Sequence, residues 1–546
     1  MAMLLFGMVF FGLISVYLGQ DYNWDLKFFH YYGAYAFFND RLLFDLAPAI
    51  EATYLNPLLD LPFYIFNENL PPKWTAFSLG ALHGINFFMV YTIAYTLFSY
   101  KESRLYIEDA SRKRMSSFAC AIVGTLGAVN ISELGATFHD NIISIFVLGS
   151  LFFIIKWLAC IDEKAASYTR KQIRNGIIIA GIVMGLAAGA KLVGLIFVLG
   201  ALAAIPVLMR NTKEKFFAVI LFGASVFVGM LVTHGYWSYI MWKNFESPLF
   251  PFFNNIFRSP YADMTAVFEY RFFPKSLTQT LFYPFYFASM NRTTSEVYFR
   301  DIRFAVVYSL IVLAFIRAMI ARFSAGRNLS AAVTSAVDRR LSLFFAIFFI
   351  VSYIVWQGMF SIYRYTATLE FLCPIIIVLL LSYILSGLKK KALPVTVAII
   401  FALMLSTVQY PAWGRIYWSS DSYFDVKVPE IDFKENSIVI FPFLEAMSFI
   451  IPSFPEHVRF VSLQEVTPNP NKIKVMVSDL ISKQTDPMYA IMPRYKTRGD
   501  LNEALSVLDQ HKLELVENSC MKIETKKNIH TRPYAICEIR KVKQTL

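Results

Sequence analysis

The stretch ATLEFLCPIIIVLLLSYILSGLKKKALPVTVAIIFALMLSTVQ, residues 367–409, consists of two apolar runs separated by Lys389, Lys390 and Lys391. A membrane-spanning helix needs about 20 apolar residues, and each run approaches that length. A short basic turn between two apolar runs is typical of a cytoplasmic loop in a multi-pass membrane protein. This stretch therefore predicts two successive membrane helices.

The rest of the chain has the same character. Hydrophobic residues make up 56% of the 546 residues and charged residues only 16%, which excludes an ordinary soluble protein of this size. The pattern predicts about eleven spans: 2–18, 75–99, 116–133, 141–158, 175–190, 193–209, 216–234, 303–321, 341–358, 367–386 and 392–409. The run at 2–18 has no basic residues before it and no small-residue cleavage site after it, so we expect a retained span rather than a signal peptide. The segments 175–190 and 193–209 form either one long kinked helix or two short spans that turn at Lys191.

Basic residues are concentrated in every second connection between the predicted spans. The clusters are Lys101 to Arg114, Lys164 to Arg174, Arg210 to Lys215, Arg322 to Arg340, and Lys389 to Lys391. The positive-inside rule then places the N-terminus in the cytoplasm and the C-terminal region outside. The net charge of +12 is explained by these loops, so we expect no nucleic-acid partner.

Three segments are expected outside the cytoplasm: the loops 19–74 and 235–302, and the tail 410–546, which has the composition of a soluble domain. The chain is thus predicted to be an α-helical polytopic membrane domain, 1–409, with a C-terminal extracytoplasmic α/β domain. Its expected strands are 437–443, 458–463, 474–477, 488–492 and 535–539, and its expected helix is 498–510.

The cysteines divide into two groups. Cys120, Cys160 and Cys373 lie in or beside apolar runs and are expected to be inert packing residues. Cys520 and Cys537 lie in strand-like segments of the tail and are expected to form a disulfide, which would place the tail in an oxidising compartment.

The first external loop opens with two carboxylates and a histidine, Asp21, Asp25 and His30. Carboxylates are costly beside a membrane and tend to persist where they have a function. The alternative is a hydrated loop whose acids cap a helix.

The short connection between the third and fourth spans carries Glu133, His139 and Asp140. Asp140 is suited to cap the following helix. The predicted sidedness nevertheless places this connection on the same face as Asp21 and Asp25, so acids from two helix ends can converge on one cavity.

Two isolated cations are expected on that face. Lys191 interrupts Gly185–Gly194, where it either snorkels to the interface or faces a pocket allowed by its small neighbours. Arg364, followed by Tyr365, is the only basic residue between the ninth and tenth spans. Together these cations suit a phosphate at the outer interface. Arg258, in a proline- and aromatic-rich loop expected to serve mainly as scaffold, is a secondary candidate for contacting a lipid phosphate.

Several common motifs are missing from the sequence. It has no Walker loop, no GxGxxG after a strand, no zinc-type Cys/His spacing and no GxSxG elbow. Asp21 and Asp25 also lack the DxD spacing associated with metal-held nucleotide sugars. Nucleotide-driven chemistry on the cytoplasmic side therefore has no support.

The stretch that begins at Asp25 and ends with Arg41-Leu-Leu-Phe-Asp45 resembles the GT-C superfamily of membrane glycosyltransferases, and most of all its polyprenol-dependent mannosyltransferase branch. His139-Asp140 resembles the family's second acidic loop, Gly-Ala-Lys191 its "Gly-x-x-Lys" helix, and Tyr363-Arg364-Tyr365 its "Arg-Tyr" motif. The resemblance covers roughly residues 1–410. The family's tyrosine after the principal acid corresponds to Phe28, Phe29 or His30, so Asp21 and Asp25 remain alternative choices for that acid.

The resemblance implies a GT-C-like fold and an inverting sugar transfer outside the cytoplasm, from a polyprenyl-phosphate donor to a hydroxyl of a lipid, glycan or protein. Asp25 or Asp21 would be the general base, with Asp140 as a further choice. Lys191 and Arg364 would stabilise the departing phosphate, while His30, Glu133, His139, Arg258 and Tyr365 would contact substrate. No cofactor or obligatory metal is expected, and the compartment is expected to be the bacterial inner membrane. The alternative is a transporter or a flippase for lipid-linked sugars, which would carry charges at mid-span and an internal repeat.

Overall fold

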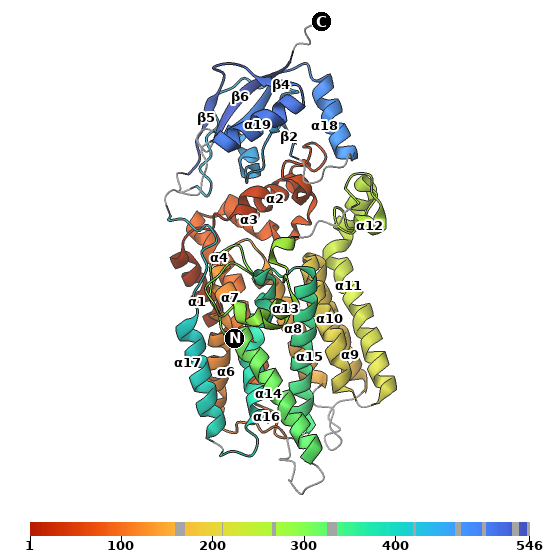
Figure 1. The fold of residues 1–546 in the computed structure, drawn as a ribbon, viewed down its shortest axis with the longest axis vertical. Coiled ribbons are helices and arrows are strands. Elements are labelled where there is room, and N and C mark those ends of the chain that lie inside the picture. Colours follow the sequence, from red (N-terminus) through yellow and green to blue (C-terminus); the bar gives the residue numbers. More distant parts are fainter. Residues whose placement is uncertain are drawn as a thin grey trace.

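The computed structural model describes residues 1–158, 170–209, 211–264, 269–324, 336–389, 391–418, 422–464, 471–493, 498–526 and 534–542. Its long axis runs from a helical bundle at one end to a sheet-containing domain at the other (Figure 1). Between them lie α2 (Tyr31–Phe38) and α3 (Leu61–Asn69), which belong to the first long loop. The chain is therefore a membrane-type bundle that carries a small α/β domain.

Each predicted span coincides with one or two helices of the bundle. These are α1 (Ala2–Leu18), α4 (Pro72–His83) with α5 (Ile85–Leu97), α6 (Ala110–Thr125) with α7 (Ala128–Ser132), α8 (Asp140–Leu158), α9 (Arg170–Ala190), α10 (Leu195–Ala204), α11 (Thr212–Phe245), α14 (Arg303–Ser324), α15 (Ala336–Met359), α16 (Ala367–Ile384) and α17 (Ala392–Thr407).

Seven helical segments of the described chain are long and apolar enough to cross a membrane. They are Pro72–Leu97, Asp140–Trp157, Lys171–Ala190, Thr212–Phe245, Arg303–Phe323, Val337–Met359 and Tyr363–Ile384. Ala2–Leu18, Leu192–Leu208 and Ala392–Thr407 are shorter apolar helices. The protein is thus embedded in a membrane through several helices, whereas the predicted number of eleven spans exceeds the number that meet the length criterion.

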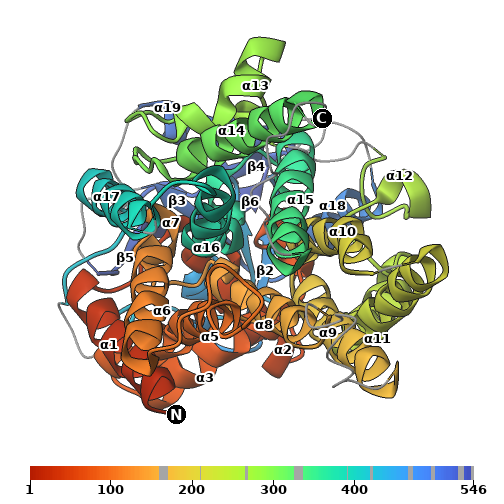
Figure 2. The same cartoon turned by 90° about the horizontal axis from the view of Figure 1, so that it is seen from below.

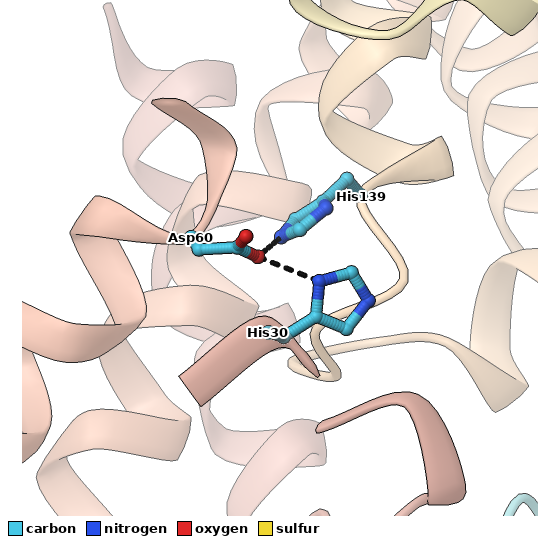
Figure 3. A group of neighbouring side chains, drawn as sticks. All are labelled: His30, Asp60 and His139. Carbon is cyan, nitrogen blue, oxygen red and sulfur yellow. Dashed lines mark hydrogen bonds and ion pairs between the residues drawn. The ribbon is translucent and has the colours of Figure 1, made fainter. Parts of the chain in front are cut away.

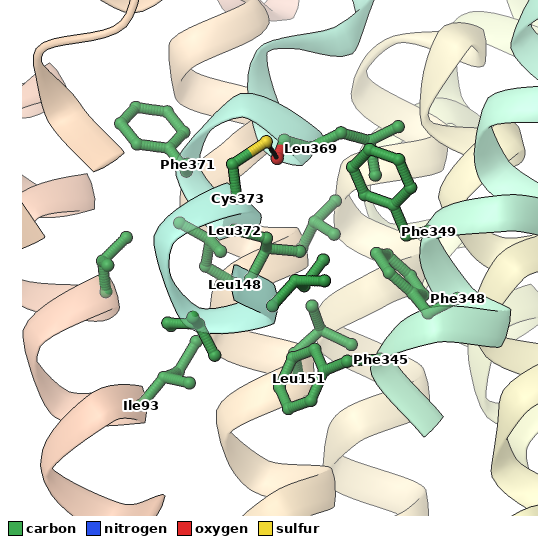
Figure 4. Close-up of a cluster of buried hydrophobic side chains, with 14 of the residues drawn as sticks. Ile93, Leu148, Leu151, Phe345, Phe348, Phe349, Leu369, Phe371, Leu372 and Cys373 are labelled. Carbon is green, nitrogen blue, oxygen red and sulfur yellow. Dashed lines mark hydrogen bonds between the residues drawn. The ribbon is translucent and has the colours of Figure 1, made fainter. Parts of the chain in front are cut away.

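Helix α16 lies at the centre of the bundle, with α5, α6, α8, α14, α15 and α17 around it (Figure 2). Almost all of its side chains are buried, because every face of the helix meets another helix. Figure 4 shows the apolar contacts around it, where Leu372 and Cys373 pack with Leu148 of α8 and Phe348 of α15. The burial of Cys373 and Cys120 fits their prediction as packing residues, and Cys160 lies outside the described residues.

The chain turns back at Lys191, so 175–190 and 193–209 are separate helices rather than one kinked helix. Lys191 has extended backbone between α9 and the short 3-10 turn Leu192–Gly194. On α9, Gly185 lies against the backbone of α11, where an added Cβ would approach Val226 O to 2.1 Å. Small residues thus permit the close packing of α9 on α11, and this packing fixes the end of α9 from which Lys191 projects.

Hydrogen bonds group the connections into two ends of the bundle. At one end, the Tyr100 hydroxyl donates to Ile155 O, and the Arg317 guanidinium donates to Ser386 O. At the end facing the α/β domain, Lys191 meets Asp140 and Arg364 meets Asp25. This grouping matches the alternation of loops expected from the charges. Which end faces the cytoplasm remains a prediction of the positive-inside rule.

The loop expected at 235–302 begins later than predicted, because α11 continues to Phe245. Trp237, Met241 and Phe245 form an apolar stripe that packs against Tyr54 and Phe250, and burial of this stripe extends the helix. The loop contains α12 (Asn254–Phe257) and α13 (Leu277–Tyr286).

The α/β domain has one sheet with the strand order β2-β1-β3-β6-β4, and β5 also pairs with β6. The strands are β1 (Ile438–Phe441), β2 (Arg459–Ser462), β3 (Met488–Pro493), β4 (Leu513–Leu515), β5 (Met521–Ile523) and β6 (Tyr534–Lys541). Strand β1 is parallel to β2 and β3, whereas β6 is antiparallel to β3. Cys520 and Cys537 form the predicted disulfide.

The strand predicted at 474–477 is wrong, because this segment lies in α18 (Lys472–Lys483). The Asn471 side chain caps this helix by accepting the Lys474 amide hydrogen. Val477 and Ile481, one turn apart, are its buried residues, so the apolar period is helical rather than alternating. The helix expected at 498–510 is α19 (Arg498–Gln510).

The first loop and the α/β domain share one hydrophobic core, and an ion pair within the first loop forms hydrogen bonds to the α/β domain. Arg41 binds Asp45 at 2.8 Å and also donates to the carbonyls of Glu456 and Val458. Asp45 accepts the Phe460 amide hydrogen at 2.8 Å, and Leu46 extends the sheet beside β2. The sheet domain is thereby held over the end of the bundle that carries the polar residues described next.

Candidate functional site

Asp21 and Asp25 lie four residues apart in the chain but occupy different environments. Asp21 is 1% exposed and accepts hydrogen bonds from Asn23 and Thr137. Burial raises the pKa of its carboxyl, and the nearby Arg415 opposes that rise. The Asp21 carboxylate thus accepts hydrogen bonds from four donor groups, which tie the first loop to the residues before α8.

Asp25 stands at the start of a π-helical turn, Leu26–His30, and faces Arg364. Its Oδ2 lies 2.8 Å from Nη1 of Arg364, and the two side chains are 21% and 13% exposed. The guanidinium also lies 4.8 Å from the centre of the Phe138 ring. π-Helical turns occur frequently at functional sites, and this one presents Asp25 with a side chain that is partly exposed.

Asp140 forms a second ion pair beside the first. Its Oδ1 accepts from the Lys191 ammonium at 2.8 Å, and the same ammonium donates to Phe138 O at 2.8 Å. Lys191 is 23% exposed and lies 5.0 Å from the centre of the Tyr365 ring. Asp140 is the first residue of α8. The carbonyl of the preceding His139 accepts the amide hydrogens of Ile142 and Ile143. Within the described chain its carboxylate pairs with Lys191 rather than capping the helix.

Several polar atoms of this region have no hydrogen-bond partner among the described residues. They are both carboxylate oxygens of Glu133, Oδ2 of Asp140 and Nε of Arg364. Glu133 is 1% exposed, and its charge interacts with those of Asp140, Lys191 and Arg364. A buried polar atom without a partner costs about 1–3 kcal/mol, so a group of them at one point indicates a place where a polar ligand binds.

His30 and His139 flank a residue that the sequence analysis missed, Asp60. Nδ1 of His30 lies 2.6 Å, and Nε2 of His139 lies 3.1 Å, from the same Oδ1 of Asp60 (Figure 3). The two rings are 4.6 Å apart at an angle of 82°. Asp60 directly precedes α3. Acidic residues are common at this position because they can cap a helix, so no feature of the sequence distinguished Asp60 as a site residue.

Burial governs the protonation of these three side chains. It raises the pKa of the Asp60 carboxyl well above its ordinary value and lowers the pKa values of His30 and His139. The positive charge of Lys191 lowers all three pKa values. Neutral imidazoles are therefore favoured next to this carboxyl group.

Of the predicted site residues, the structure brings together Asp25, His30, Glu133, His139, Asp140, Lys191, Arg364 and Tyr365. Asp21 is placed nearby in a structural role. Arg258 is exposed at the end of α12, with left-handed backbone (φ 56°), and forms no ion pair within the described residues. Its secondary role as a phosphate contact is therefore unsupported by the site's geometry.

A separate crevice lies between the first loop, the second loop and the α/β domain. Its lining includes Tyr54, Phe250, Tyr261, Lys474 and His511. This crevice also contains Glu51, whose charge interacts with that of Lys474, but it does not include the Asp25–Arg364 and Asp140–Lys191 ion pairs.

No protein-family model, curated protein or solved structure matches this chain. The function is therefore argued from the site itself.

Proposed function

We propose that this protein is a membrane glycosyltransferase of the GT-C type, which transfers a sugar from a polyprenyl-phosphate donor to a hydroxyl acceptor on the side of the α/β domain. The observation that carries the proposal is the pairing of partly exposed Asp25 with Arg364 next to the Asp140–Lys191 pair. These two acids and two cations lie at the end of the helical bundle that faces the α/β domain, where Asp25, Lys191 and Arg364 are partly exposed and Asp140 is buried. A lipid-linked donor would reach them from the bilayer, and a polar acceptor from outside it.

In this proposal Asp25 is the general base. It is the more exposed of the two paired acids, at 21% against 5% for Asp140, so an acceptor hydroxyl can approach it. Asp25 would take the hydroxyl proton as the oxygen attacks the anomeric carbon, and the bond to the phosphate would break on the opposite face of the sugar. Proton transfer by a positioned carboxylate contributes about 100-fold or more to such a step.

Lys191 and Arg364 would bind the phosphate that departs. Both cations project from helix ends, and each has a neighbouring aromatic face formed by Tyr365. Nε of Arg364 has no hydrogen-bond partner among the described residues, which leaves a donor for a phosphate oxygen. Charges fixed in a site that excludes water stabilise developing negative charge without reorganisation.

The test is hydrolysis and transfer with a panel of polyprenyl-phosphate sugars, followed by mass spectrometry on the protein purified in detergent. We expect slow hydrolysis of one donor by the wild type and loss of it in Asp25→Asn. The matched control is Glu108→Gln, an exposed acid between α5 and α6, which should behave as wild type.

Two results would overturn the proposal. In one, no donor is hydrolysed or bound by folded wild type. In the other, Asp25→Asn turns the donor over at the wild-type rate. If donor is instead moved across proteoliposome membranes without cleavage, the protein is a flippase.

A further inference from the structure

The three buried side chains His30, Asp60 and His139 are not needed by the sugar transfer proposed above. They come from three segments: the π-helical turn, the residue before α3 and the residue before α8. Their exposed fractions are 7%, 5% and 6%. One ligand atom from each lies within 4.8 Å of the other two. Such convergence from distant segments requires either hydrogen bonds or a shared ligand.

Hydrogen bonding accounts for only part of this arrangement. His30 makes a hydrogen bond to Asp60 at 2.6 Å. Nε2 of His139 lies 3.1 Å from the same oxygen, yet within the described chain it has no partner in hydrogen-bond geometry. A nitrogen that is close to an oxygen but not directed at it is the geometry expected when both atoms point to a third atom.

We propose that His30 Nδ1, Asp60 Oδ1 and His139 Nε2 bind a zinc-type divalent ion. Two imidazoles and one carboxylate form a donor set that suits Zn²⁺ and not Mg²⁺, which prefers oxygen ligands. Tetrahedral ligands about 2.0–2.2 Å from zinc are about 3.3 Å apart. The two separations from Asp60 Oδ1, 2.6 and 3.1 Å, reach this value with shifts below about 1 Å. The two histidine nitrogens lie within 4.8 Å of each other, so the side chains would close on the ion by up to about 1.5 Å.

The ion would act on the position of the two acids. His30 ends the π-helical turn that begins after Asp25, and His139 directly precedes Asp140. A metal bound to both histidines therefore fixes the two backbone segments that present Asp25 and Asp140. Three protein ligands leave the fourth zinc position to water or to a substrate oxygen, as in catalytic rather than structural zinc sites.

Metal content tests this inference without any sugar donor. The protein is purified in detergent with a tag free of histidine, incubated with zinc chloride, freed of excess metal and analysed by inductively coupled plasma mass spectrometry. We expect about one zinc per wild-type chain and almost none in His139→Ala or Asp60→Asn. The matched control is His234→Gln, because His234 is a partly buried histidine of α11 outside the trio; this variant should keep its zinc.

X-ray absorption of the zinc-loaded wild type gives a second result that does not depend on any variant folding. We expect two imidazole nitrogens and one or two oxygens at about 2.0–2.2 Å. Folded wild type without zinc after loading, zinc with sulfur or without imidazole ligands, or full zinc in monodisperse His139→Ala would each overturn the site. Zinc binding with no sugar transfer would leave the metal site standing and remove only the proposed function.

Discussion

Two buried ionic clusters lie near the same end of the bundle, and they differ in how completely their polar atoms are paired. The first contains Asp301, Arg303 and Glu370, all 0% exposed. Arg303 forms an ion pair with Asp301 and donates to Val123 O and Leu126 O. Within the described residues, only Nε of Arg303 lacks a hydrogen-bond partner in this cluster. Glu370 accepts from the Val129 and Asn130 amides and from the Tyr363 hydroxyl.

The second cluster contains Asp25, Asp140, Lys191, Arg364 and Glu133. Its ion pairs are single contacts, three of its side chains are 13–23% exposed, and Glu133 has no hydrogen-bond partner in the described chain. The polar groups of the first cluster thus bind one another and the backbone, and so join α6, α7, α14 and α16. The second cluster retains polar atoms that could bind a ligand. Charge alone does not distinguish a structural cluster from a binding site, but the pairing of the atoms does.

The largest effect is expected from Arg303→Met, which leaves Asp301 buried without its cation. Removing one partner of a buried ion pair typically costs about 3–5 kcal/mol, and thermal unfolding in detergent measures the loss. The matched control Arg364→Met should unfold near the wild-type temperature, because Asp25 is 21% exposed and can be hydrated. Equal destabilisation by both substitutions would remove the distinction between the clusters.

Asp25→Asn should lower donor turnover by at least about 100-fold, because an amide cannot accept the acceptor proton. Its unfolding temperature should stay close to that of the wild type. Turnover is measured by mass spectrometry of released sugar, with unfolding followed on the same sample. A variant that is destabilised as much as Arg303→Met would show that Asp25 serves structure instead.

Asp21→Asn should have the opposite profile to Asp25→Asn. The amide nitrogen replaces a carboxylate oxygen that accepts from Asn23 or Thr137, so a loss of about 1–3 kcal/mol of stability is expected. Activity per folded molecule should be retained. Unfolding curves and turnover normalised to the monodisperse fraction check this, and a fully folded but inactive variant would make Asp21 the base.

Glu133→Gln should give the smallest effect, and one of opposite sign. It removes a buried charge that has no hydrogen-bond partner in the described chain, so the free energy of unfolding should rise by about 1 kcal/mol. Turnover should fall, since residues that serve a site are often kept at a cost in stability. A decrease in the unfolding temperature would show that Glu133 is paired in the folded protein.

The sequence was informative where a property is local or periodic. Apolar runs located the helices. The sequence left open whether 175–190 and 193–209 form one kinked helix or two spans, and the extended backbone at Lys191 decided for two helices. The candidate residues from the ends of separate helices were brought together, except Arg258 and Asp21. The strand predicted at 474–477 was wrong because its short apolar run, 475–477, fits a strand and a helix equally well when the helix cap is not recognised.

Asp60 is a residue of the candidate site that the sequence did not indicate. It stands thirty residues from His30 in the chain, and no spacing rule links it to His139. Arg41 and Asp45 show the same limitation, since they were compared with a family motif but join the first loop to the sheet domain.

The amino-acid sequence by itself determined that this is a membrane protein with alternating loops and a disulfide-containing α/β domain. Hydropathy and charge can be read along the chain, because apolar segments partition into the bilayer and basic loops favour its cytoplasmic side. The tertiary structure decided which acids are satisfied and which are left for a ligand. That difference depends on which backbone amides and cationic side chains lie within about 3 Å of each carboxylate oxygen. These donors belong to segments that are far apart in the chain.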